Sequence, residues 1–525
     1  MPIERVVIEN FKAFHHLDLP LNAHMNLIVG NNEVGKSTLL EAIHAVVTGQ
    51  LHGRGVAYEI TPYLFHQPTV QTYLAGLKQG QFGSPQRIMI EAYLGADPAL
   101  AALRGTNNSL GANTAGLRLL IELNEDYRSE FDAYVRQHQD GGLPVEYYTV
   151  RWYSFANNGV TARSIPFDST IIDTSAAKTL SGADRYIAGI IDQVLTTEQR
   201  VALSLSYRRM RQSFALEPDV TAINTFLAKN NDDISNKSLS VGVDTSARST
   251  WEGSLSPYLD ELPFTHAGKG EQSAVKMKLA MRAASAAHVL LVEEPENHLS
   301  FSNMTQLIDK IATLSSTQQV VIATHSSFVL NKLGVDNVIL FSANGYMKLE
   351  QLPPDTHDYF MKLPGHDTLR LILAKQAILV EGPSDELIVQ RAFLDHHGMS
   401  PLARGVDVIS VKSLAFKRFL QIAQRLGINA RVVTDNDGDI AVLQERYADF
   451  LNQIYYDSDE AAPSLEQQLI KANSLDKLNL VLNKKFADEA AMLKFMQGNK
   501  TDTALAIFSS PNSIAFPDYV QRAIA

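Results

Sequence analysis

The feature that most constrains this chain is a pair of acidic motifs, each of which directly follows a short apolar run. Glu381–Asp385, with the sequence EGPSD, follows Ala377–Val380, and Asp435–Asp437, with the sequence DND, follows Arg431–Thr434. Such runs are typical of buried parallel strands, and open α/β sheets form their sites at the carboxyl ends of those strands. The motifs therefore predict an α/β sheet with carboxylates gathered along one edge.

Four carboxylates are expected at this edge. Glu381 ends its strand, and Asp385 falls in the first turn of a helix that Pro383 is suited to open. Asp435 and Asp437 are two residues apart, so on an extended backbone their side chains project to the same side. Carboxylates this close repel one another unless cations lie between them, and hard oxygen ligands without histidine or thiol favour Mg²⁺ or Mn²⁺. A solvated acidic loop is the alternative, but it accounts poorly for two motifs that each follow a strand.

The two motifs together resemble a TOPRIM domain, the metal-dependent fold that cuts or joins nucleic-acid phosphodiesters. The resemblance implies two divalent ions, held by Glu381, Asp385, Asp435 and Asp437. Asp439 is a further implied ligand, with simple closure of the turn as the alternative role.

A second motif lies near the start of the chain. Gly30–Ser37, with the sequence GNNEVGKS, matches the P-loop pattern between a strand-like run, Met25–Val29, and a helical pattern, Thr38–Val47. In that context backbone N–H groups at a helix N-terminus cradle phosphates, while Lys36 reaches the β- and γ-phosphates and Ser37 the Mg²⁺. The expected nucleotide contacts are Asn31, Asn32, Gly35, Lys36, Ser37 and Thr38. The motif predicts ATP with one Mg²⁺; an empty glycine-rich turn is the alternative.

Further elements of an ATPase follow downstream. His288–Val292 leads into Glu293 and Glu294 and resembles a Walker B element, in which Glu293 would orient Mg²⁺ and Glu294 would activate the attacking water. Glu293 stands where an aspartate is usual. Gln319–Ala323 precedes His325, which is placed like the switch histidine of ABC-type ATPases. The alternative role for His325 is a cap or core residue.

Gly268–Gln272 resembles a degenerate ABC signature motif, with Gly270 expected to face the γ-phosphate of a nucleotide bound by an opposing subunit. Glu271 replaces the usual second glycine, which implies that it points away or that hydrolysis is slow. A chain with one P-loop and one signature forms two complete sites only with a second copy, so a homodimer or higher homo-oligomer is expected.

The order of these motifs resembles that of the OLD (overcoming lysogenization defect) family of ATPase–nucleases. Ile3–Phe14 looks like the first strand and turn of their ATPase head, and Pro517–Val520 is also similar. Leu465-Glu466 and Asn499–Thr501 resemble late motifs, which implies Glu466 as an extra metal ligand and Lys500 as a cation beside the scissile phosphate. The resemblance spans nearly the whole chain and is weakest from about 100 to 255. It is greatest to the Gabija-type class, which is paired with a UvrD-like helicase in antiviral defence.

The resemblance implies an ABC-type P-loop ATPase interrupted by a helical dimerisation insert and followed by a TOPRIM domain. The expected bounds are 1–165 and 239–352 for the ATPase, 175–235 for the insert and 369–525 for the TOPRIM domain. Leu51–Pro85 is expected to be an insertion outside the core, and 353–367 a linker.

The composition of the chain limits its domain number, its location and its partners. The 525 residues suit about three domains, and 45% hydrophobic content supports large cores. No run of 18 apolar residues or signal-peptide core occurs, so a cytoplasmic protein with no membrane partner is expected. Zero cysteines exclude disulfides and thiolate zinc sites. The net charge of −11 excludes a generally basic nucleic-acid surface, so DNA contacts are expected to be local. Lys412, Lys417 and Arg418 fall at the rim of the acidic site, where a plain solvated helix face is the favoured interpretation of each, less so of Lys412.

The expected function is metal-dependent cleavage of DNA, gated by the ATPase. Two alternatives stay open. One is a topoisomerase- or primase-type enzyme, although the chain leaves little room for a tyrosine domain and has no cysteine for a zinc module. The other is a non-catalytic DNA clamp or repair ATPase whose acidic site is structural.

Overall fold

The computed structural model describes residues 2–81, 83–137, 142–162, 164–173, 195–229, 240–241, 258–268, 270–272, 275, 287–297, 300–342, 345–354, 356, 370–372, 374–411 and 416–525. The chain divides into two compact units, one of Met1–Asn26 with Ser37–Ala323 and one of Leu27–Lys36 with Thr324–Ala525. No helix in the described part of the chain is long and apolar enough to cross a membrane.

The first unit contains an antiparallel sheet in the order β2-β1-β6-β8-β7, with β9 paired to β8. Its strands are β1 (Ile3–Phe11), β2 (Phe14–Pro20), β6 (Ile88–Leu94), β7 (Arg104–Gly105), β8 (Thr114–Leu123) and β9 (Tyr148–Ser154). Long apolar strands hold the sheet together, and Phe155 fills the space over Gly116, where an added Cβ would lie 2.1 Å from its ring. The predicted first strand and turn are therefore present.

Helices α1 (Lys36–Thr48), α2 (Gln67–Lys78) and α3 (Arg128–Gln137) accompany this sheet in sequence, with a small hairpin of β4 (Gln50–Leu51) and β5 (Arg54–Gly55). In α2, Val70, Tyr73 and Leu77 recur at helical spacing and are buried. The expectation that 51–85 lies outside the core is therefore wrong for α2, because its apolar stripe is packed.

Three parallel strands complete the first unit: β10 (Ser169–Asp173), β13 (Val289–Glu293) and β14 (Gln319–Thr324). Helix α8 (Phe301–Leu314) is capped by Ser300. Within the predicted insert, the structure describes α5 (Thr197–Ala215) and α6 (Pro218–Lys229), and β11 (Tyr258–Leu259) pairs with β12 (Leu262–Pro263) beyond it. The rest of 175–235 and most of the 353–367 linker lie outside the described residues.

In the second unit, β3 (Met25–Gly30) pairs in parallel with β15 (Val338–Ser342), which pairs antiparallel with β16 (Gly345–Lys348). The short helix α9 (Ser327–Leu333) lies between β14 and β15 in sequence. Gly30 permits a close approach, since an added Cβ would lie 2.4 Å from the carbonyl oxygen of Phe341. The strand and helix predicted around the P-loop are thus both present.

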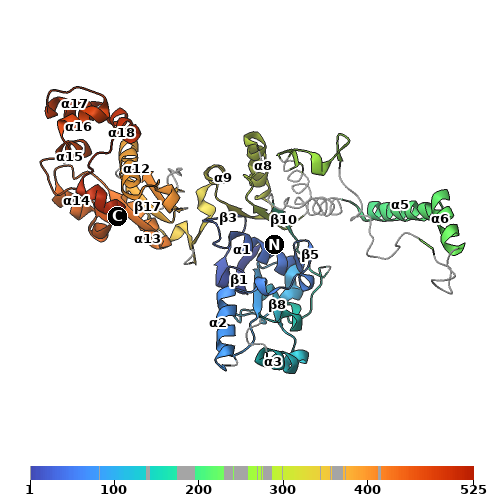
Figure 1. The fold of residues 1–525 in the computed structure, drawn as a ribbon. Coiled ribbons are helices and arrows are strands. Elements are labelled where there is room, and N and C mark those ends of the chain that lie inside the picture. Colours follow the sequence, from blue (N-terminus) through green and yellow to red (C-terminus); the bar gives the residue numbers. More distant parts are fainter. Residues whose placement is uncertain are drawn as a thin grey trace. The chain divides into compact units, whose positions relative to one another are not determined.

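The C-terminal part is built on a parallel sheet in the order β18-β17-β19-β20. Figure 1 shows β17 and helices α12 to α18 of this part in orange and red. Its strands are β17 (Gln376–Val380), β18 (Val406–Ser410), β19 (Asn429–Val433) and β20 (Ile454–Tyr455). The helices are α12 (Pro383–His397), α13 (Phe416–Leu426), α14 (Ile440–Arg446), α15 (Leu465–Ala472), α16 (Leu475–Leu482), α17 (Glu489–Gly498), α18 (Lys500–Ser509) and α19 (Asp518–Ile524). One core spans the sheet and helices, including Ile378, Leu469, Leu478, Met492, Ile507 and Val520.

The predicted fold class is confirmed: the chain has a P-loop α/β part followed by a C-terminal parallel α/β sheet. Strand β17 ends at Val380, directly before the first acidic motif, and α12 opens at Pro383 as predicted. The bounds of the four predicted domains stay predictions.

Candidate functional site

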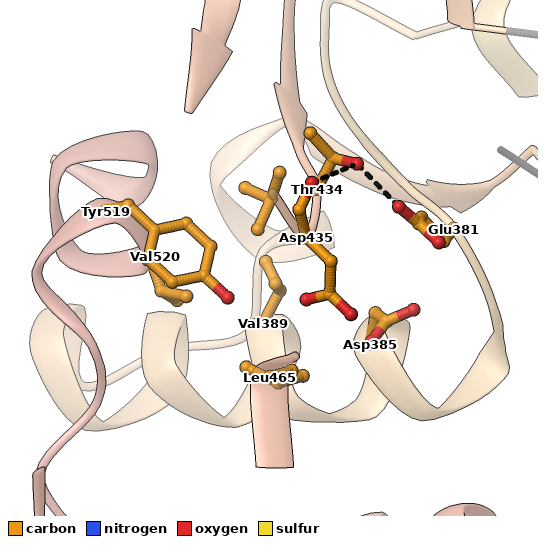
Figure 2. Close-up of a pocket in the computed structure, with 9 residues that line it drawn as sticks. Glu381, Asp385, Val389, Thr434, Asp435, Leu465, Tyr519 and Val520 are labelled. Carbon is orange, nitrogen blue, oxygen red and sulfur yellow. Dashed lines mark hydrogen bonds between the residues drawn. The ribbon is translucent and has the colours of Figure 1, made fainter. Parts of the chain in front are cut away.

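A pocket at the carboxyl ends of β17 and β19 gathers the acidic motifs (Figure 2). Its walls are formed by Glu381, Asp385, Val389, Val433, Thr434, Asp435, Leu465, Tyr519 and Val520. Apolar side chains form one part of the lining, while carboxylates from two strand ends and one helix form the other. The structure thus brings together three of the predicted metal ligands, Glu381, Asp385 and Asp435.

Two of these carboxylates are held by hydrogen bonds. The Thr434 hydroxyl donates to Oε1 of Glu381 across 2.5 Å, and the backbone N–H of Gly382 donates to Oδ2 of Asp385 across 2.9 Å. The second bond forms because Asp385 is the third residue of α12, where a side-chain oxygen can reach back to the free N–H groups at the helix start. Both side chains are therefore oriented before any ligand binds.

The surroundings of the pocket disfavour the negatively charged form of its carboxyl groups. Burial, followed by the charges of Glu381 and its neighbours, raises the pKa of Asp435 to about 8. Burial and Glu381 likewise raise the pKa of Asp385 to about 6, against the opposing effects of its backbone hydrogen bond and of Lys500. Without a cation, the pocket therefore favours protonated forms of these two carboxyls.

Glu466 and Lys500 lie beside this cluster. Glu466, on α15, is only 7% exposed and its Oε1 lies 3.3 Å from Nζ of Lys500, the first residue of α18. Burial lowers the pKa of Lys500, but Glu466 and the pocket aspartates outweigh burial and raise it. The lysine therefore stays protonated beside the carboxylates.

The position of Lys500 depends on how the opposite end of its helix, α18, is anchored. The buried guanidinium of Arg391, on α12, donates to the carbonyls of Ile507, Phe508 and Ser510, which follow or end α18. These bonds satisfy carbonyls that a helix C-terminus leaves free. Because α12 also carries Asp385, one helix orients both an acid and the lysine.

The second acidic motif, Asp435–Asp437, does not have the extended backbone that was predicted for it. Strand β19 ends at Val433, and Asp437 has a left-handed backbone with φ of 51°, so Asp435 and Asp437 do not lie on an extended strand. Asp437 is exposed and does not line the pocket. Asp439 accepts from the backbone N–H of Val442 and caps α14, which is the alternative role weighed for it. The metal roles of both residues stay predictions.

Three residues of this site were not predicted. Thr434 orients Glu381, and Tyr519 enters the pocket from α19. Asn436 is buried inside the DND turn, where its amide donates to the carbonyls of Asp457 and Asp459 and its Oδ1 accepts from Gly438. An aspartate–asparagine–aspartate–glycine run signals a turn, and this signal could have identified the role of Asn436.

The described residues offer the oxygen donors that a hard cation prefers, but they do not form a complete coordination shell. In the described part of the chain, no three His, Cys, Asp or Glu side chains surround one point closely enough to hold a metal ion. Several carboxylates nevertheless open to one pocket, and the buried Oε2 of Glu466 has no hydrogen-bond partner there. Oxygen donors of this kind suit Mg²⁺ or Mn²⁺.

The P-loop is formed as predicted. Glu33 and Gly35 have φ of 69° and 98°, which turns the backbone around the site, and Nζ of Lys36 donates to the carbonyls of Gly30 and Asn31 across 2.8 and 2.7 Å. Asn32 is exposed and Thr38 is buried. Lys36 therefore satisfies loop carbonyls at the place where it would meet phosphates.

Two of the residues predicted to contact Mg²⁺ lie together, and the roles of the Walker B residues stay predictions. The Ser37 hydroxyl donates to Glu293, so the two residues predicted to share a Mg²⁺ are already in contact. Glu294 has a left-handed backbone with φ of 42°, and its carboxylate accepts from the Asn297 amide. An unfavourable backbone of this kind is more frequent at functional sites.

Two further predicted ATPase residues lie at the surface. His325 is exposed after β14, and Gly270 is exposed in residues 270–272, which are helical. Lys269 and Lys412 lie outside the described residues. Lys417 forms an ion pair with Asp449 at 3.6 Å, which reduces its availability for DNA.

Family models match three parts of the chain. The model described as overcoming lysogenization defect protein-like, TOPRIM domain, matches residues 372–437. An AAA domain model matches residues 5–73 and an AAA ATPase domain model matches residues 177–330. Together they give ATPase domains followed by an OLD-like TOPRIM domain, which confirms the architecture recognised from the motifs.

Similar proteins cover smaller parts. The DNA replication and repair protein RecF of Actinobacillus pleuropneumoniae serotype 5b is 38% identical over 82 residues, 15% of this chain and 22% of that protein. RecF of Pasteurella multocida is 33% identical over 92 residues, 16% of this chain and 26% of that protein. The chain thus spans about a quarter or less of these relatives. The solved SMC head domain from Thermotoga maritima has a TM-score of 0.29 at 13% identity, covering 66% of this chain and 99% of that one.

Proposed function

We propose that this protein, which has the ATPase–TOPRIM architecture of the OLD family, is an ATP-binding, divalent-metal-dependent DNA endonuclease. The observation that carries the proposal is the pocket that holds Glu381, Asp385 and Asp435 together, with Lys500 paired to Glu466 beside it. A purely structural acidic cluster gains nothing from buried carboxylates that raise one another's pKa, whereas a metal site requires them.

The side chains divide the chemistry between them. Glu381, Asp385, Asp435 and Glu466 are the groups that would hold divalent cations, and the predicted number is two, with Asp437 as a further ligand. Bound cations would supply an activated water and neutralise the leaving oxygen. Thr434 fixes the orientation of Glu381, and Lys500 provides a fixed positive charge for the phosphate in the transition state.

The ATPase is proposed to gate cutting. The contact of Ser37 with Glu293 and the loop around Lys36 support binding of ATP with one Mg²⁺, and Glu294 is the proposed base. Nucleotide that favours one arrangement of two chains changes the population of states that reach the nuclease site. ATP activates cutting if the nucleotide-bound state is the one that cuts DNA, and it restrains cutting if the nucleotide-free state is.

Pairing of two chains is also proposed. Helices α5 and α6 and the residue that follows α5 expose large apolar side chains, among them Val201, Met210, Phe214, Phe226 and, after α5, Leu216. Exposed apolar side chains gathered on two adjoining helices are typical of an interaction surface, and a second copy would also complete the predicted nucleotide sites. A UvrD-like helicase partner, a role in antiviral defence and a cytoplasmic location are proposed on the family resemblance.

Incubation of supercoiled plasmid with the protein and Mn²⁺ or Mg²⁺ tests the function. The nuclease predicts nicked or linear DNA that disappears with chelator. Relaxed topoisomers would instead support a topoisomerase, and a mobility shift without cutting would support a clamp. Co-purification with a UvrD-like helicase of the same organism tests the proposed partner.

A further inference from the structure

Tyr519 is the pocket residue for which neither the predicted metal site nor the ATPase accounts. Its side chain is only 2% exposed, yet it lines the acidic pocket, and its hydroxyl points toward the carboxylate of Asp435 (Figure 2). In the described part of the chain, the Tyr519 hydroxyl has no hydrogen-bond partner. The Asp435 carboxylate, which faces the same pocket, has none there either. A donor and an acceptor without partners therefore share one small space.

The chain holds Tyr519 firmly in this place. Two side chains from other elements bind the last carbonyls of α19. Arg431 of β19 donates to the carbonyl of Ala523 across 2.6 Å, and His397 of α12 donates to the carbonyl of Ile524 across 2.8 Å. The segment before the helix is fixed by Asn473, whose amide exchanges two hydrogen bonds of 2.8 Å with the backbone of Ala515. Anchors on both sides keep the ring from swinging out of the pocket.

The chemistry of a phenol limits what this hydroxyl can do. A phenol is a weak acid, so the Tyr519 hydroxyl carries its proton at neutral pH. A neutral phenol is a good hydrogen-bond donor and a poor nucleophile, so the hydroxyl is better suited to donate to a carboxylate than to attack a phosphodiester.

We propose that Tyr519 is a positioning residue of the metal site, whose hydroxyl donates to the Asp435 carboxylate when a divalent cation is bound. This inference rests on the proposed function. One oxygen of Asp435 would face the cation while the other accepts from Tyr519, so the carboxylate is held in one orientation. Partners behind metal ligands typically contribute 10- to 100-fold in metal affinity, because they orient the ligand before binding.

A double-mutant cycle tests this coupling without any cleavage assay. Binding of Mn²⁺ to the full-length, nucleotide-free protein is measured by titration calorimetry for the wild type, Tyr519→Phe, Asp435→Ala and the double variant. We expect Tyr519→Phe to weaken Mn²⁺ binding about 10-fold. In the Asp435→Ala background, the same substitution should change the affinity less than about twofold, because alanine leaves no acceptor for the hydroxyl.

Tyr148→Phe is the matched control. Tyr148 is also buried, and its hydroxyl has no partner among the described residues, but it lies on β9, in the other compact unit of the chain. It should leave Mn²⁺ affinity unchanged. Equal Mn²⁺ affinity of Tyr519→Phe and wild type, or equal losses with and without the Asp435 carboxylate, would overturn the proposal.

DNA incubation separates this inference from the proposed function. A covalent protein–DNA adduct that disappears in Tyr519→Phe would overturn the donor role and assign the tyrosine as a nucleophile. Intact metal coupling in a protein that never cuts DNA would support the positioning role while refuting the nuclease.

Discussion

The hydroxyl of Thr434 donates to Oε1 of Glu381 across 2.5 Å and so joins the ends of two neighbouring strands. Glu381 directly follows β17, and Thr434 directly follows β19, so the bond depends on the register of the parallel sheet. Glu381 and Thr434 are 53 residues apart in the chain, so the bond shows that the two acidic motifs meet at one place rather than form two separate turns.

Thr434→Val tests the importance of this bond. Valine keeps the shape and the backbone bond of Thr434 to Tyr455 but removes the donor, so Glu381 becomes free to turn. A hydrogen bond to a charged group contributes about 1.5–3 kcal/mol, so we expect at least a tenfold loss of cutting rate together with a melting temperature lowered by a few degrees. Thr434→Ser, which keeps the hydroxyl, is the control and should retain activity; equal rates for Val and Ser would remove Thr434 from the site.

The metal-free protein should gain stability when one carboxylate is removed. The pKa of Asp435 is raised in the folded state, so its stabilising contribution is full below its ordinary pKa and is lost as pH rises toward about 8. Asp435→Asn should therefore melt about 2–4 °C above wild type at pH 8 and close to it at pH 4. Differential scanning fluorimetry in chelator checks this.

Saturating Mn²⁺ should reverse that order, since wild type gains ligand-binding energy that the variant lacks. A wild-type melting temperature that does not change with pH between 4 and 8 in chelator would contradict a buried, mutually repelling cluster.

ATPase variants test gating. Lys36→Ala should weaken ATP binding, because the phosphates lose a direct positive charge. Glu294→Gln should bind ATP and hydrolyse it slowly, which keeps the protein in its nucleotide-bound state. The two variants should shift plasmid cutting in opposite directions when ATP is present, as measured by initial rates. Identical rates for both, with and without ATP, would show that the ATPase does not control the nuclease.

Light scattering tests assembly. In nucleotide-free buffer the protein should have at least twice the 57.9 kDa mass of the chain. Met210 and Phe214 lie one turn apart on α5 and are both exposed, so Met210→Asp combined with Phe214→Asp places two charges on one helix face. We expect this pair to produce monomers with normal ATP binding. A wild-type monomer at micromolar concentration would refute a permanent contact through the insert.

The sequence was sufficient where local patterns decide structure. The starts of α1 and α12 and the ends of β3 and β17 follow from short apolar runs, a P-loop and a proline, and each is found near its predicted position. Local pattern was insufficient for Asp437, because the strand stops at Val433 and the buried Asn436 turns the chain. An alternation rule applies only while the backbone is extended.

Contacts distant in sequence could not be predicted. Tyr519 reaches the pocket only because α19 packs against β19. The family resemblance implied Lys500 and Glu466 at the site, but their ion pair depends on the anchoring of α18 by Arg391. Nothing near Tyr519 in the chain indicates that carboxylates more than 80 residues earlier will surround it. Such placements depend on tertiary packing, which periodicity and motif spacing do not encode.

The most direct measurement compares cutting of a labelled DNA duplex by wild type, Asp435→Ala and Asp439→Ala in saturating Mn²⁺. Asp435 opens into the pocket, whereas Asp439 caps α14, so only the first carboxylate should be essential. The account predicts cutting by wild type and by Asp439→Ala, and none by Asp435→Ala. Cutting by Asp435→Ala at the wild-type rate would contradict a carboxylate-held metal centre as the nuclease site.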